Sequence, residues 1–218
     1  MSNLNQKAKP ESESRLMILV PTSFEFEIVK ESLAAFQNTI VEVCGFGPVI
    51  PAAKTVELIN KHQPKSVLLL GIAGSYGDQI EVGDACSFSK VGCYGVGVGT
   101  GESFQTCGQM GWKHLADPKV TIGDSISFGS FGQELLTVCT AAENETDVKL
   151  RQRIFPNAVA EDMEGFAVAA ACELCQTPLH IVRGISNRAG DRDKQNWQIK
   201  PALAAAVSLA KKVVKVNA

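Results

Sequence analysis

The sequence predicts an α/β fold, a three-layer α/β/α sandwich built on a central mixed, mostly parallel sheet. Short apolar runs at residues 16–20 (LMILV) and 67–70 (VLLL) are typical of strands buried on both faces. Pro or Gly-rich turns follow the strands, and residues 23–36 and 50–62 then show helical spacing of apolar residues. This alternation of strand, turn and helix is what places the predicted strands mostly parallel.

Length and composition predict one domain over residues 16–218, preceded by a polar, disordered tail at residues 1–15. The chain has 218 residues, 45% of them hydrophobic, which is enough for one buried core. Its net charge of -2, without a basic stripe, excludes polymeric nucleic acid as a partner. No stretch approaches the ~18 apolar residues of a membrane span and no apolar leader is present, so we expect a cytoplasmic protein without a membrane partner.

Neither the cysteines nor the glycines predict a cofactor or a metal. The seven cysteines are odd in number and scattered, which favours reduced thiols. Cys172 and Cys175 form a CxxC, but it lies in an expected helix without a second pair or a nearby His, which favours packed thiols. GFGPVI at residues 45–50 lacks the third glycine of a dinucleotide-binding fingerprint.

Chemically distinctive residues concentrate between residues 160 and 197. An acidic cluster (Glu161, Asp162, Glu164) is expected to open a helix, and LHIVRGIS at residues 179–186 reads as a buried strand. The loop after that strand is crowded with polar and aromatic residues, among them Asn187, Arg188, Asp191, Arg192, Asp193 and Trp197. Because ligands of open α/β sheets bind at the carboxyl ends of strands, this loop is the predicted site.

DMEG at residues 162–165, a helix, and then RGISN at 183–187 together resemble the paired signatures of the nucleoside phosphorylase and nucleosidase superfamily. This resemblance extends from about residue 16 to the end, and ISNRAGDRDKQNW is most similar to the futalosine hydrolases within the superfamily. It implies a nucleoside phosphorylase-like fold, a small-molecule nucleoside substrate, no cofactor and a homo-oligomer, a dimer or larger.

The resemblance also implies which glutamates act on the sugar. In SFEFEIV, Glu27 aligns with the glutamate that activates the attacking water, and Glu25 stays open as the alternative. Either could instead be a first-turn acid favoured by the helix dipole. Glu164, with the backbone of Met163, would hold the 2′ and 3′ hydroxyls of the ribose. An acid that only satisfies free amides at a helix start is the competing interpretation of Glu164.

Other positions would line the pocket or recognise the rest of the substrate. By resemblance, Gly71, Ala73 and Gly74 of the GIAG turn and Ser186 line the pocket. Asn187 would face N7 and the C6 substituent of the purine, where a carboxamide can donate to both acceptors of hypoxanthine. Arg188 or Arg192 would pair with the aryl carboxylate on the 5′ side of futalosine, and Trp197 would pack on its ring. The residue that stacks on the base, and the role of the Gly-rich residues 90–134, remain open.

A gap in the arginines favours water as the nucleophile. Phosphorylases of this superfamily grip phosphate with arginines from the first half of the chain, but here no arginine lies between Arg15 and Arg151. Together with the resemblance to futalosine hydrolases, this implies hydrolysis of futalosine to hypoxanthine and dehypoxanthine futalosine in menaquinone biosynthesis. The alternatives are a methylthioadenosine/adenosylhomocysteine nucleosidase, disfavoured by Asn187 where those enzymes have Asp, a purine nucleoside phosphorylase, and a nucleoside-binding module without turnover.

Overall fold

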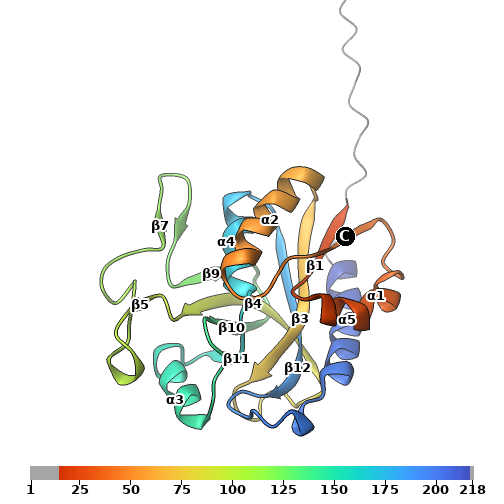
Figure 1. Cartoon of the computed structure of the whole chain (residues 1–218). Helices are drawn as coiled ribbons and strands as arrows, with labels where there is room; N and C mark the ends of the chain where they lie inside the picture. The colour runs from red at the N-terminus through yellow and green to blue at the C-terminus, as the bar shows by residue number, and fades with distance from the viewer. Residues whose placement is uncertain (1–14, 217–218) are drawn as a thin grey trace, which may run out of the picture.

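A computed structural model describes residues 15–216 and confirms the predicted fold class (Figure 1). A mixed, mostly parallel sheet of eight strands lies between helices packed on both faces. The predicted disordered tail at residues 1–15 lies, apart from Arg15, outside the described residues.

The elements follow one another in the order that the strand–turn–helix pattern predicts for the first half of the chain. The strands of the main sheet are β1 (Leu16–Val20), β2 (Thr39–Val43), β3 (Ser66–Ser75), β4 (Ala85–Tyr94), β9 (Ser125–Ser127), β10 (Gln133–Val138), β11 (Ala158–Asp162) and β12 (Leu179–Arg188). The helices are α1 (Ser23–Leu33), α2 (Val49–His62), α3 (Glu145–Ile154), α4 (Gly165–Leu174) and α5 (Ile199–Val216). Within residues 15–216, no helix combines the length and the apolar character that crossing a membrane requires.

The sheet has the order β11-β10-β4-β12-β3-β1-β2, with β9 paired to β4. β12 lies at its centre, parallel to β3 and antiparallel to β4. β11 pairs in parallel with β10 and also, at Ala160 and Glu161, antiparallel with the end of β3. The pairings of β3, β12, β4, β10 and β11 therefore return to their start, so that this part of the sheet closes into a ring and brings the ends of its strands together.

Two helical layers bury the faces of the sheet (Figure 1). On one face α2 and α4 pack together, and Leu58 and Val168 belong to the core beneath them. On the other face α1 and α5 contribute Val29 and Ala206 to a second core. Burying these apolar stripes supplies the main favourable free energy of the fold.

Two parts of the chain differ from the expectations. Glu161 and Asp162 end strand β11 instead of opening a helix, and α4 begins only at Gly165. The strand was missed because its two acidic side chains are buried, and each is paired with a buried arginine.

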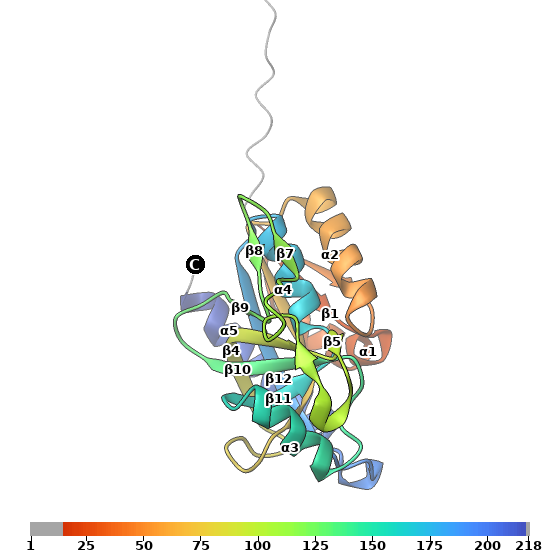
Figure 2. The same cartoon turned by 90° about the vertical axis from the view of Figure 1, so that its left-hand side faces the viewer.

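The Gly-rich residues form an excursion from the sheet (Figure 2). It consists of β5 (Gly97–Val98), a 3-10 turn (Gly101–Ser103), β6 (Gln105–Thr106), β7 (Leu115–Ala116) and β8 (Thr121–Ile122), and it returns to the sheet through β9. β5 pairs with β6, and β7 pairs with β8, both antiparallel. Strands this short give no apolar alternation, which is why the sequence did not predict them.

Candidate active site

A cavity of about 390 Å³ opens where the carboxyl ends of several strands meet. Ala73 and Gly74 near the end of β3, Asp162 of β11 and Asn187 of β12 all line it. Helix α1 and the loop of residues 190–199 complete its walls. This volume lies within the range of small-molecule sites, and its position is the one expected of a ligand site in an α/β sheet.

Glu25 points into this cavity from the first turn of α1. It is only 4% exposed, and its carboxylate accepts hydrogen bonds from Thr22 Oγ1 at 2.6 Å and from the Ile72 backbone N–H at 3.1 Å. Thr22 is also the N-cap of the helix, because its side chain accepts from the Glu25 N–H at 3.2 Å. The cap and the end of β3 thus hold one carboxylate at a fixed place on the cavity wall.

Glu27, the predicted water-activating residue, does not reach the cavity. Its side chain is 62% exposed and pairs with Lys30 at 2.5 Å on the outer face of α1. Two residues along a helix turn a side chain by roughly 200°, so Glu25 and Glu27 cannot share a face. The structure corrects the predicted position, and Glu25 is the glutamate that lies in the site.

Arg183, which the sequence analysis did not single out, lies fully buried beneath the cavity. Its guanidinium donates to Asp162, through Nε at 3.1 Å and through Nη2, and Nη2 also donates to Glu164 at 3.2 Å. Its Nη1 has no hydrogen-bond partner among the described residues. Gly71 lies below the cavity and makes room for this group, since a Cβ there would stand 2.2 Å from Nη1 and 2.9 Å from Glu25 Oε1. One free donor is therefore buried beside Glu25.

Glu164 lies in the cavity wall at the N-terminus of α4 but makes no capping hydrogen bond with its own helix. Its two oxygens instead accept from the Gly47 N–H and from Arg183 Nη2, each at 3.2 Å. Burial, with a smaller contribution from nearby Asp162, raises the pKa of Glu164 to about 7, against the lowering effect of Arg183. The capping interpretation is therefore wrong. Met163 also lines the cavity.

Ser186 and Asn187 line the cavity at the end of β12. The Ser186 hydroxyl donates to Asn187 Oδ1 at 2.8 Å, and Asn187 Nδ2 donates to the Arg188 carbonyl at 2.7 Å. The carbonyl can only accept, which fixes the orientation of the amide. One N–H of Nδ2 is thus engaged, and the other is left for a ligand.

Arg188 and Arg192, the two arginines predicted to bind the 5′ group of the substrate, lie in different places. Arg188 lies outside the cavity, where its Nη2 pairs with Asp78 at 2.6 Å and its Nη1 donates to Ser75 Oγ at 3.3 Å. Arg192 lines the cavity and its guanidinium lies 5.2 Å from the centre of the Trp197 ring, which lines it too. Of the two, Arg192 is the one that a substrate could reach.

A second buried arginine, Arg151 of α3, was also missed. It pairs with Glu161 through Nη1, and its Nη2 donates to the Thr140 carbonyl at 2.9 Å. Glu161 accepts in addition from Tyr76 Oη and from the Ala142 N–H, each at 2.7 Å. The sequence signal was a charge inside the apolar run of residues 179–186 for Arg183, whereas Arg151 lies among polar residues of α3 and gives no such signal.

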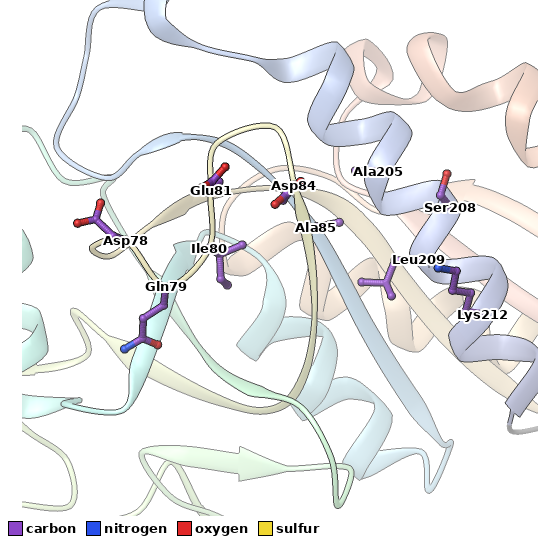
Figure 3. A pocket seen from close by; sticks show the side chains of 10 residues that line it. All are labelled: Asp78, Gln79, Ile80, Glu81, Asp84, Ala85, Ala205, Ser208, Leu209 and Lys212. Carbon is purple, nitrogen blue, oxygen red and sulfur yellow. The ribbon is translucent and has the colours of Figure 1, made fainter.

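Two further cavities differ in their relation to this site. One of about 510 Å³ lies between the β3–β4 connection and α5, and Figure 3 shows Asp78, Glu81 and Asp84 spread along the connection with Lys212 on the helix. Its side chains do not converge on one point. Another cavity, of about 620 Å³, shares Phe24 and Trp197 with the site and is bordered by Lys194 and Lys200. We call this adjoining cavity the basic extension of the site.

Comparison with known proteins agrees with this architecture. The family model described as "Phosphorylase superfamily" matches residues 115–216. The chain is 28% identical over 188 residues to 5'-methylthioadenosine/S-adenosylhomocysteine nucleosidase of Chromohalobacter salexigens, covering 82% of this chain and 80% of that one. It is 27% identical over 180 residues to futalosine hydrolase of Streptomyces coelicolor, with 79% and 77% covered.

The fold matches that of a solved relative. The native structure of futalosine hydrolase of Helicobacter pylori superposes with a TM-score of 0.76, at 15% sequence identity, covering 93% of this chain and 97% of the other. Each of these relatives bears the name of a nucleosidase or a hydrolase. Fold, family model and relatives thus all liken the chain to the nucleoside phosphorylase and nucleosidase superfamily, and the relatives named above are enzymes.

Proposed function

We propose that the protein hydrolyses the N-glycosidic bond of a purine nucleoside, and that futalosine is its substrate. One observation carries the proposal: Glu25 and Glu164 border one cavity, and buried Arg183 bonds to Glu164 while keeping a free donor beside Glu25. Glycosidic cleavage needs a positioned water, a clamp on the ribose and stabilisation of the departing base. The cavity offers a group for each.

Glu25 would serve as the general base. Its oxygens are held by Thr22 and Ile72, and the water that it activates would also accept from Arg183 Nη1. The water gives a proton to the carboxylate as its oxygen bonds to C1′, and the electron pair of the C1′–N9 bond leaves with the purine. Such a base contributes typically 10² to 10⁴ in rate.

Glu164 would clamp the sugar. A carboxylate accepts two hydrogen bonds and so matches the vicinal 2′ and 3′ hydroxyls of a ribose. The Gly47 N–H and Arg183 hold the carboxylate in place, and the Met163 backbone lies beside it in the cavity wall. Because protonation turns one of the two accepting oxygens into a donor, the raised pKa predicts weaker ribose binding below about pH 7.

Asn187 would recognise the leaving base. The remaining N–H of Nδ2 can donate to one acceptor on the N7/O6 edge of hypoxanthine, rather than to both as the sequence suggested. Negative charge builds on the purine as the bond breaks, so this donor gains strength in the transition state. Phe24 and Phe46 also line the cavity and are the aromatic candidates for contact with the base or the sugar.

The basic extension supports a substrate with a large, anionic 5′ group. Arg192 lines the main cavity, Trp197 lines both cavities, and Lys194 and Lys200 border the extension. The aryl carboxylate of futalosine would find a ring to pack on and cations to pair with. A methylthio group needs neither.

The second candidate is methylthioadenosine/adenosylhomocysteine nucleosidase, favoured by the name of the Chromohalobacter salexigens relative, which is as similar in sequence as the futalosine hydrolase. The two candidates share the catalytic chemistry and differ in the base released. They are separated by incubating the purified protein with futalosine, its 6-amino analogue and methylthioadenosine, and by measuring free base by chromatography. We expect hypoxanthine from futalosine in phosphate-free buffer.

The other outcomes of that assay are equally distinct. Faster release of adenine from methylthioadenosine would select the second candidate. Release that requires added phosphate would identify a phosphorylase, and binding without release would identify a nucleoside-binding module. The cytoplasmic location and the homo-oligomer remain predictions; light scattering of the purified protein measures the oligomeric state.

A further inference from the structure

Three potential metal ligands meet outside the candidate active site, in the Gly-rich excursion. Cys107 follows β6, His114 precedes β7, and Asp124 lies between β8 and β9. The ligand atoms of these side chains all lie within 4.8 Å of one another. Within residues 15–216, no other group of three such side chains comes as close. Thus three separate turns direct a thiol, an imidazole and a carboxylate to one place.

His114 carries a nitrogen that the protein leaves without a partner. Its Nε2 is buried and forms no hydrogen bond within the described residues. The nearest carboxylate oxygen, Asp124 Oδ1, stands 3.9 Å away, which is too far for a hydrogen bond. On its other side the imidazole packs against Phe166, with ring centres 5.1 Å apart. A buried imidazole nitrogen without a partner is costly unless a ligand completes it.

Asp124 is held in position before any ligand arrives. Its carboxylate accepts from Thr106 Oγ1 at 2.5 Å and from the Gly108 N–H at 3.1 Å. Its backbone carbonyl accepts from the Cys93 N–H of β4 at 2.9 Å. A Cβ at residue 108 would stand 2.3 Å from Asp124 Oδ2, so the close approach requires glycine there. Preorganised outer partners of this kind are typical of metal ligands.

We propose that Cys107, His114 and Asp124 bind one Zn²⁺ ion per chain. Thiolate, imidazole and carboxylate are all zinc ligands, and three of them leave a fourth tetrahedral position for water. The thiolate and the carboxylate together neutralise the ion, and the Cys107 thiol releases one proton to solvent on binding. The sequence had predicted no metal, because residues 107, 114 and 124 do not follow the spacing of a known zinc motif.

Tetrahedral coordination requires the three side chains to draw together. Zinc bonds of about 2.1 Å to nitrogen and oxygen place these two atoms about 3.4 Å apart, so His114 Nε2 and Asp124 Oδ1, now 3.9 Å apart, would approach by about 0.5 Å. A sulfur at about 2.3 Å from the ion lies about 3.6 Å from either atom. Cys107 would therefore move in by up to about 1.2 Å from the 4.8 Å bound, which a change of rotamer in its half-buried turn can supply.

The ion would fix the excursion against the helix that follows the ribose clamp. None of the three ligands lines the cavity of the candidate active site. His114 does contact Phe166, the second residue of α4, whose N–H donates to Thr137 Oγ1 at 2.7 Å. The role is therefore structural: short strands with little core of their own gain a cross-link.

The test uses the full-length, reduced protein after dialysis against a chelator. Equilibrium dialysis with Zn²⁺ should give one ion per chain, and Co²⁺ in its place should show a thiolate-to-cobalt charge-transfer band. Cys107→Ser should abolish that band and lower zinc affinity by at least about 100-fold, since losing even an outer partner costs about 10- to 100-fold. His114→Gln should lower the affinity as well.

Two matched controls remove a thiol and an imidazole elsewhere. Cys175→Ser changes a thiol just past the end of α4, and His62→Gln changes an imidazole that pairs with Glu42; both variants should bind zinc as the native protein does. If native protein binds no stoichiometric zinc, or if Cys107→Ser binds it unchanged, the proposal is overturned. Should a variant fail to fold, the cobalt spectrum of the native protein decides alone, because a bound ion without the charge-transfer band excludes Cys107.

Discussion

Strand β11 ends in two neighbouring acids, Glu161 and Asp162, and each meets a buried arginine, yet the two pairs differ. Around Arg151 both terminal nitrogens are bonded, and the Glu161 carboxylate is filled by Tyr76 and a backbone N–H as well. Around Arg183 the Nη1 donor remains free beside Glu25. We call the fully bonded network around Arg151 closed and the network around Arg183, with its free Nη1, open. A closed network only stabilises the fold, whereas an open one keeps a donor available for a ligand.

The free donor of Arg183 distinguishes the functional site better than burial does. Both arginines are almost fully buried, and both acids border the same cavity. Buried ion pairs bring little net stability, because desolvation offsets the attraction, and an unpaired buried donor adds a cost. The open network is therefore the one whose cost requires a functional explanation.

The largest expected effect lies at the open network. Glu25→Gln keeps the shape but removes the base, so kcat should fall by about 10² to 10⁴. Glu27→Gln, two residues away on the exposed face, is the matched control and should keep native kcat. Steady-state release of the purine base measures both. If kcat falls only in Glu27→Gln, Glu27 and not Glu25 is the general base.

Breaking the closed network should cost stability instead of chemistry. Arg151→Met leaves Glu161 charged and buried, which should lower the free energy of unfolding by about 3 to 5 kcal/mol. Urea unfolding gives the loss, and kcat per folded molecule should stay within about tenfold. Adding Glu161→Leu should restore much of the stability, because the uncompensated charge disappears. A large fall in kcat at full stability would mean that this network also serves the reaction.

The pKa of Glu164 adds a pH dependence to the open network. Between its ordinary 4.5 and about 7 this carboxyl binds more protons in the folded than in the unfolded protein, so its contribution to stability is full at low pH and is lost as pH rises through this window. The loss is on the order of 3 kcal/mol. Urea midpoints between pH 4.5 and 7.5 should show a slope that Glu164→Gln removes. An identical slope in the variant would assign it to other groups.

The smallest effect sharpens which base the site prefers. Asn187→Asp removes the free N–H donor, so activity on futalosine should fall relative to its 6-amino analogue by about ten- to a hundredfold in kcat/KM. An adenine edge suits a protonated Asp, which donates with one oxygen and accepts with the other. An unchanged ratio would show that Asn187 does not read the base.

Apolar pattern predicted the layers because burial leaves a local signature. Residues 16–20 and 67–70 read as buried strands in the sequence and are β1 and the first part of β3 in the structure. Glu161 and Asp162 concealed β11, since a buried acid looks like a surface acid until its arginine is located. The short strands β5 to β8 left no pattern at all, because two residues cannot alternate visibly.

The candidate site was predicted in place but not in every side chain. Glu164 and Asn187 both line the cavity, and both stand in the stretch that the sequence had predicted as the site. Which of Glu25 and Glu27 faces the cavity depends on the residue at which α1 begins, and the structure was needed to locate that residue. Arg183 was invisible as a site residue because it lies inside a strand, facing inward to acids far away in the chain.

The closed ring of strands also imposes an order on how the chain can mature. β12 stands between β3 and β4, yet it is synthesised long after both. Until residues 179–188 are available, the edges of β3 and β4 that face β12 lack this neighbour, and the pairing of β3 with β11 also joins residues far apart in sequence. Distant pairings of this kind slow folding and leave strand edges open to wrong partners in the meantime. The growing chain thus depends on its last strand to seal the sheet.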